Sequence, residues 1–425
     1  MNSTSRRSGC ARSPLRTRMP ALGCVQFSTA SSPPVQYRGY PPFRYSFSMG
    51  ILGRKCLTVA LSCAICLGEI SCGHTNAFSP PIPMTAVMQA VRDYNRGQRT
   101  ILPTSTAPLG TQDSPNNSSD ADGPYQAHVG LLFAQGDLAA IEKIAHQVRI
   151  DKSRLSGGVW KLVGFYEGVS KPPARDHSTD GEWSGHIDDL KKWVAAYPES
   201  ATARIALAQA YIDYAWFARG SGYSNSVSDS SWEVFTKRIA LAKATLVEAA
   251  RLEEKCSYWY EAMQTVALAE GWDKKQAREL FDQATAFDST YYHYYREYAN
   301  FLLPKWYGEE GETQAFADEV SSRLPEPDAS IIYFEIASLL ACQCDKDRDS
   351  LDGMSWPKAK QGYAELTRLY GTSNLKMNRF AYMSFVADDR ISAQSAFSTL
   401  GTDWNHLVWR SAANFESARS WATSP

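Results

Sequence analysis

Apolar side chains recur at helical spacing from about residue 125 to the C-terminus, and this period constrains the fold more than any other feature. The clearest case is an aromatic row in which Tyr291, Tyr294, Tyr295 and Tyr298 fall on one face of a helix. No stretch alternates between apolar and polar residues as a half-buried strand does. The pattern therefore predicts an all-α fold. It favours the Tyr row as a packing face over an aromatic platform for a cofactor.

Small and aromatic residues also repeat at the spacing found in the second helix of tetratricopeptide units. The matching sets are Ala277, Phe281, Ala284 and Ser289; Asp389, Ala393 and Phe397; and Ala242, Leu246 and Ala249. The signature of the first helix (Trp, Leu-Gly, Tyr) is missing in every case. We therefore expect an irregular, tetratricopeptide-like stack of antiparallel helix pairs, an α-solenoid, with a globular helical bundle as the alternative.

Three local patterns make sharper predictions. Residues 84–94 are predicted to form one short amphipathic helix. A long helix that begins with "SWEVF" is expected to have Ser230 or Ser231 as its N-cap. The segment "DHSTDGEWSGH" contains His177, Asp180, Glu182 and His186, which are metal-ligand residue types, but their spacing fits no compact site and predicts a solvated loop.

Changes in composition, all within the N-terminal third, divide the chain into four parts. Residues 1–48 are rich in Arg, Ser and Pro, which predicts a disordered basic extension or a spurious upstream start. Residues 49–77 have a basic start and an apolar stretch too short to span a bilayer, which predicts a signal peptide, with an organelle transit peptide as the alternative. Residues 78–126 are predicted to be a Pro/Ser-rich linker, and residues 127–425 the helical-repeat domain.

The distribution of charged residues and cysteines limits the classes of partner and the cellular compartments that we expect. Nine of the 44 Lys and Arg residues, but none of the 45 acids, lie in the first 55 residues, so the remaining chain is acidic. An acidic body argues against binding to nucleic acid. Periplasmic or secreted localisation is expected, with no transmembrane span in the mature chain and a lipid anchor at Cys63 or Cys72 as a less favoured alternative. In an oxidising compartment, Cys256 is a candidate to pair with Cys342 or Cys344.

The chain resembles an uncharacterised bacterial family with a tetratricopeptide-like helical fold, catalogued as a domain of unknown function. The resemblance covers nearly the whole helical part. It is carried by "GGVWKLVGFYEG", by "YAWFARGSGYSNSV" followed by Trp232 and Phe235, by "YANFLLPKWYGEEG", and by the closing "FAYMSFVADDRISAQSAFSTLG" and "FESARSWA". It implies a helical fold and a setting in the cell envelope or outside the cell, and it brings no activity.

No sequence signature of a nucleophile, a phosphate-binding loop, a metal site or a cofactor site stands out, so we expect a protein-interaction scaffold and no enzyme. Arg and aromatic residues in helix-connecting loops are frequent interface anchors. The candidate partner-binding residues are Arg219, Tyr223, Arg296, Lys305, Trp306 and Tyr307. The alternative is a carbohydrate-active helical enzyme of the cell envelope, because paired carboxylates close in space need not be close in sequence.

Overall fold

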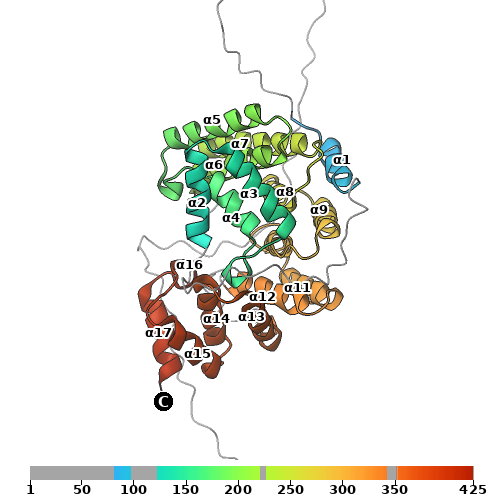
Figure 1. Cartoon of the computed structure of the whole chain (residues 1–425). Helices are drawn as coiled ribbons and strands as arrows, with labels where there is room; N and C mark the ends of the chain where they lie inside the picture. Colours follow the sequence, from blue (N-terminus) through green and yellow to red (C-terminus); the bar gives the residue numbers. More distant parts are fainter. Residues whose placement is uncertain (1–80, 97–121, 221–225, 342–350, 352, 425) are drawn as a thin grey trace, which may run out of the picture. The chain divides into compact units, whose positions relative to one another are not determined.

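The computed structural model describes residues 81–96, 122–220, 226–341, 351 and 353–424, and these form helices joined by turns and loops (Figure 1). This part of the chain contains 17 α-helices, two short 3-10 helices (η1 and η2) and no β-strand, which confirms the all-α prediction. The elements are α1 (Met84–Tyr94), α2 (Asp122–Ala134), α3 (Leu138–Asp151), η1 (Ser156–Gly158), α4 (Lys161–Val169), η2 (Arg175–His177), α5 (Asp180–Ala196), α6 (Ala201–Arg219), α7 (Asp229–Ala249), α8 (Ser257–Glu270), α9 (Lys274–Phe287), α10 (His293–Phe301), α11 (Glu312–Arg323), α12 (Asp328–Ala341), α13 (Trp356–Tyr370), α14 (Asn374–Val386), α15 (Arg390–Leu400), α16 (His406–Trp409) and α17 (Ala412–Thr423).

The helices form a stack in which sequence neighbours pack together. The even-numbered helices also contact one another in order, from α2 through α4, α6, α8, α10 and α12 to α14. Helices α7, α9 and α11 each lie beside this row against their two sequence neighbours, and α13 packs on α12. Within this row, α12 is buried from Ala329 to Ala341. This arrangement of consecutive pairs confirms the predicted stack, while the tetratricopeptide assignment stays a prediction.

The predicted packing faces are buried. Tyr291, Tyr294, Tyr295 and Tyr298 are all at most 6% exposed, so the Tyr row packs against other helices as expected. The ring of Phe281 on α9 stacks on Tyr298 with 4.8 Å between centroids. The repeat-spaced side chains of α7, α9 and α15 are buried too: Ala242, Leu246, Ala249, Ala277, Phe281, Ala284, Ala393 and Phe397.

Two local predictions were wrong. The segment expected to be a loop around Asp180 and Glu182 is the start of α5. Thr179 and Glu182 form a capping box there, in which each side chain bonds the other's backbone N–H, so Glu182 serves the helix start. The N-cap of α7 is Ser228, whose Oγ accepts from the backbone N–H of Ser231 at 3.2 Å.

Helix α1 has the predicted bounds and packs against α9, although it lies within the segment predicted to be a linker. Arg92 forms an ion pair with Glu279, and the Nδ2 atom of Asn95 donates to the backbone oxygen of Gln283 at 2.8 Å. The ring of Tyr94 stacks on Trp259 at 4.2 Å. Predictions for residues 1–77 fall outside the described residues.

The connection between α3 and α4 reaches the C-terminal helices. The backbone N–H of Gly157 donates to the carbonyl of Gly371 at 3.3 Å, and η1 packs on α13. Gly157 has φ +74°, and a Cβ there would lie 2.5 Å from the Oγ of Ser373, so glycine is required at this position. Residues more than 200 positions apart in the sequence therefore meet in one contact.

Cys256 is a buried free thiol that contacts the hydroxyl of Tyr166 at 3.5 Å. Its predicted disulfide partners, Cys342 and Cys344, lie outside the described residues. None of the helices described is both long enough and apolar enough to cross a bilayer.

Candidate interaction surface and charged row

Three of the six predicted contact residues come together around Trp216. Arg219 lies over its ring at 5.3 Å, and Trp306 meets it edge-on with centroids 6.1 Å apart. Lys305 lies 5.8 Å from the ring centroid of Trp306. Tyr223 lies outside the described residues, and the other two predicted residues, Arg296 and Tyr307, lie elsewhere.

We call this group the cation–tryptophan cluster, and its members are Trp216, Arg219, Trp232, Lys305 and Trp306. The C-terminal turn of α6 places the first two residues on one helix face, because they are three positions apart. Arg219 also lies 5.2 Å from the ring of Trp232, in the first turn of α7. The cluster is partly exposed, and Phe217 beside it is 37% exposed. Sequence reasoning missed Trp216 and Trp232 as contact candidates because they lie within helices.

Tyr307 has a structural role. Its hydroxyl donates to the backbone oxygen of Leu268 at 2.9 Å, and its ring packs on Phe301 at 4.9 Å. Burial raises the pKa of this hydroxyl above the ordinary Tyr value. The loop thus turns Tyr307 into the helices and leaves Lys305 at the surface.

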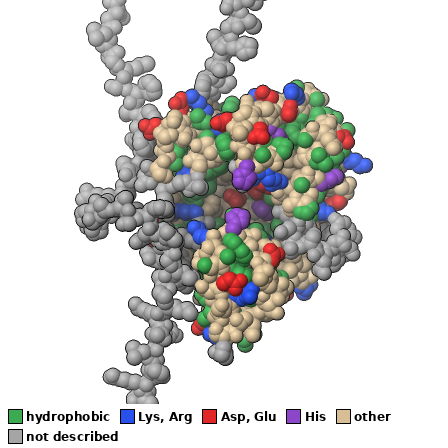
Figure 2. Space-filling view, turned by 90° about the vertical axis from the view of Figure 1, so that its left-hand side faces the viewer, with side chains coloured by type: hydrophobic (Ala, Val, Ile, Leu, Met, Phe, Trp, Pro, Cys, Tyr) green, Lys and Arg blue, Asp and Glu red, His purple; other side chains and the backbone are tan. Residues whose placement is uncertain are grey.

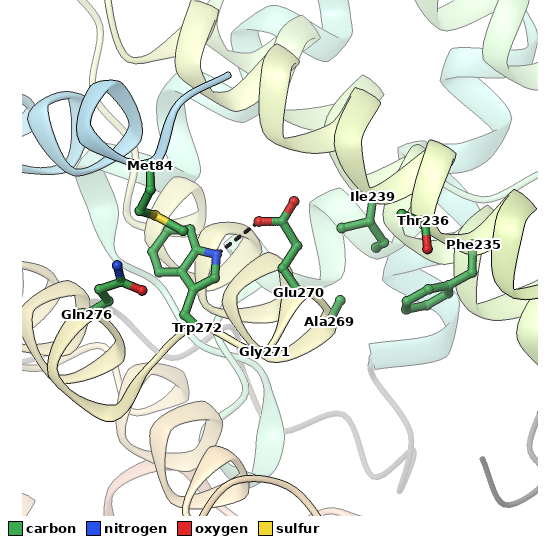
Figure 3. Close-up of a pocket in the computed structure, with 9 residues that line it drawn as sticks. All are labelled: Met84, Phe235, Thr236, Ile239, Ala269, Glu270, Gly271, Trp272 and Gln276. Atoms are coloured by element: carbon green, nitrogen blue, oxygen red, sulfur yellow. Dashed lines mark hydrogen bonds between the residues drawn. The ribbon is translucent and has the colours of Figure 1, made fainter. Parts of the chain in front are cut away.

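A pocket of about 400 Å³ lies beside the cluster, between α1, α7 and the turn from α8 to α9 (Figure 3). Met84 and Trp272 stand at one end, and Phe235 stands at the other. The Glu270 carboxylate between them pairs with Lys243 at 2.6 Å and accepts from Trp272 Nε1 at 2.9 Å. The ring of Phe235 also contacts Trp216 and Trp232, so the pocket and the cluster share this side chain.

A second group of polar residues follows the even-numbered helices from α8 to α14. We call it the charged row, and it consists of Glu261, His293, Arg296, Glu297, Glu335, Lys376 and Arg379. Figure 2 shows that acidic, basic and His side chains gather in a hollow on one face of the molecule. Sequence reasoning assigned only Arg296 to a functional surface, because these residues are spread over more than 100 positions.

Two carboxyl groups at the α8–α10 end of the row have different environments. Glu261 accepts a hydrogen bond from the Tyr291 hydroxyl and lies 3.3 Å from the Nδ1 atom of His293. Glu297 makes no hydrogen bond or ion pair within the described part of the chain. Burial, reinforced by the nearby Glu261, raises the pKa of Glu297 to about 7.

The other end of the row is dominated by cations. Lys376 forms a buried ion pair with Glu335, and the Nη1 atom of Arg296 donates to the backbone oxygen of Glu335 at 2.7 Å. Although burial opposes its ionisation, Lys376, Arg296 and Arg379 hold the pKa of Glu335 at about 2. Burial lowers the pKa of Lys376 to about 8 despite the attraction of Glu335.

The described residues contain no group of three His, Cys, Asp or Glu side chains arranged to hold a metal ion. His186, from the segment predicted to be a loop, instead contacts the backbone oxygen of Val169 at 2.9 Å. Burial lowers the pKa of its imidazole.

No protein-family model matches this chain, and neither a curated protein nor a solved structure is significantly similar to it. The resemblance to an uncharacterised bacterial family therefore stays a prediction.

Proposed function

We propose that this chain is an exported protein-interaction scaffold and that it binds a partner protein through the cation–tryptophan cluster. One observation carries the proposal. Arg219, at the end of α6, and Trp306, in the loop after α10, both contact the partly exposed ring of Trp216, and Lys305 lies over the ring of Trp306. Trp and Arg are the side chains that most often dominate binding energy at protein interfaces.

The cluster favours a partner segment that carries an acidic residue beside an apolar one. Arg219 and Lys305 present positive charge to a carboxylate, and the neighbouring Trp rings offer a flat apolar surface. The pocket behind Phe235 has room for an apolar side chain of that segment.

Affinity capture tests the scaffold proposal. The full chain carries a C-terminal tag, and proteins retained from an envelope extract of its host are identified by mass spectrometry. The double variant Arg219→Ala/Lys305→Ala is expected to lose a partner that the wild type retains. The matched control is Lys192→Ala/Arg323→Ala, which removes two exposed cations outside the cluster, on α5 and α11. A partner retained equally by all three proteins would exclude this surface.

Export rests on the predicted signal peptide at 49–77 and is tested separately. Cell fractionation should place the chain in the periplasm or the medium, and the first residue of the mature protein should follow the apolar stretch. A lipid-modified cysteine at the N-terminus would favour the anchored alternative. Chain confined to the cytoplasm would contradict export.

A carbohydrate-active enzyme is the second candidate, and the pair Glu261 and Glu297 favours it. A carboxylic acid that keeps its proton near neutral pH, beside an ionised carboxylate, is the pair that glycoside hydrolysis requires. Glu297 would donate the proton to the leaving oxygen, and Glu261 would be the second carboxyl group of the pair. Reducing-sugar release from a panel of cell-wall and storage glycans tests this candidate. Activity should be lost in Glu297→Gln and kept in Glu310→Gln.

A further inference from the structure

The cationic end of the charged row holds more positive than negative charge. Three cations from α10 and α14 act on Glu335 of α12: Arg296, Lys376 and Arg379. Arg296 also acts on Glu297, at the other end of the row. Glu335 and Lys376 are buried, at 5% and 7% exposure, so solvent screens this excess weakly.

Two of the three cations are held in place by protein contacts. Lys376 is paired with the Glu335 carboxylate. The Nη1 atom of Arg296 is fixed by the backbone oxygen of Glu335 and by the Oγ atom of Ser338, at 2.7 and 3.1 Å. The donors are thus arranged before any ligand arrives, which reduces the entropy lost on binding.

Arg379 differs from the other two cations. It lies three residues after Lys376 on α14, so both side chains share one helix face. Within the described residues its guanidinium makes no hydrogen bond or ion pair, and its Nε atom is buried. A buried N–H donor without a partner is costly, and the neighbouring cations add repulsion.

We propose that Arg296, Lys376 and Arg379 form an oxyanion-binding site that takes a phosphate or carboxylate group of a ligand. The planar fork of a guanidinium matches both groups with paired hydrogen bonds. Glu335 holds the cations together, and the ligand's anion supplies the missing negative charge and an acceptor for Arg379. The site shares no residue with the cation–tryptophan cluster, so this proposal and the scaffold proposal are tested independently.

The test uses the purified full chain and two probes, inorganic phosphate and succinate, at constant ionic strength. Each probe is titrated while the thermal unfolding midpoint is recorded, because a ligand of the folded state raises it in a saturable way. We expect saturation with at least one probe, and the probe that binds identifies the ligand class. Arg379→Gln should weaken the apparent affinity about tenfold or more, since a charge-assisted hydrogen bond is lost.

Arg368→Gln is the matched control, because Arg368 is an exposed cation paired with Glu365 on α13, and it should bind like the wild type. Without anion, Arg379→Gln should unfold at the wild-type temperature or above it, because repulsion is relieved. Arg379→Lys should bind with intermediate affinity. No saturable response to either probe, or equal affinities for wild type and Arg379→Gln, would overturn the proposal.

Discussion

At the residue scale, the pKa values of two glutamates on neighbouring helices of the charged row are shifted in opposite directions. Burial and Glu261 raise the pKa of Glu297 to about 7, whereas surrounding cations hold that of Glu335 at about 2. Both lie on helices that sequence periodicity identifies. Their environments depend on Glu261 and Lys376, which lie far away in the sequence, so these shifts could not be predicted from it.

Glu297→Gln should change the pH dependence of stability. The folded protein holds the Glu297 proton up to about pH 7, while the unfolded chain releases it near pH 4.5. The wild type therefore loses stability as pH rises through this window, and Gln removes that loss. His293 and Arg296, which face Glu297, moderate the effect. Urea unfolding should show the variant gaining about 1–3 kcal/mol on the wild type between pH 4.5 and 8. If the unfolding free energies of the two proteins changed equally with pH, Glu297 would not have a raised pKa in the folded protein.

At the element scale, sequence patterns located helices well and their starts less well. Residues 84–94 and the Tyr row were found because apolar side chains repeat every three to four positions. The first turns of α5 were missed because their polar residues, Asp180 and Glu182, serve a helix start that composition alone does not distinguish from a loop.

Thr179→Ala should remove the capping box and destabilise the protein by about 1 kcal/mol, because the first turn of α5 loses a partner for its backbone N–H. Equilibrium denaturation measures the change. Thr245→Ala on α7 is the control, since Thr245 bonds only within its own helix and Ala favours a helix. An equal loss in both variants would show that the cap has no special role.

Gly157→Ala should destabilise the protein by about 2 kcal/mol or more, because Ala disfavours a positive φ and its Cβ would meet Ser373. Gly136→Ala is the matched control. Gly136 has φ +75°, and a Cβ added there would have no atom within 4 Å. This variant should therefore lose only about 1 kcal/mol of unfolding free energy, from the strain of a positive φ in Ala. The difference between the two unfolding free energies measures how closely Gly157 packs on Ser373, the N-cap of α14, and a difference near zero would argue against this close contact.

At the scale of the molecule, Arg154 ties together segments far apart in the sequence. Its guanidinium lies 4.3 Å from the ring centroid of Trp160, 4.2 Å from that of Tyr292 and 5.0 Å from that of Tyr370. It also donates to the backbone oxygen of Thr290 at 2.8 Å. Helical period predicts a stack, but it contains no information on which distant turns touch, so this contact was not foreseen.

Arg154→Met keeps most of the side-chain length and removes the guanidinium. We expect a loss of about 2 kcal/mol, from the cation–π contacts and two hydrogen bonds. Calorimetry should also show a broader transition, because the N-terminal and C-terminal helices lose a shared contact. Arg323→Met, at an exposed position, should leave the transition unchanged. A sharp, unshifted transition in the Arg154 variant would contradict this role.

The Cys256 thiol can report local opening of the helices that cover it, through the rate at which it is chemically labelled. The Tyr94 hydroxyl bonds the backbone of Cys256, and the thiol is 1% exposed. A thiol reagent can reach it only when a helix that packs on it, such as α1 or α4, moves away or when the whole fold opens. The rate at which a peptide containing Cys256 becomes labelled, compared with the rate of global unfolding, therefore separates departure of one helix from loss of the entire stack.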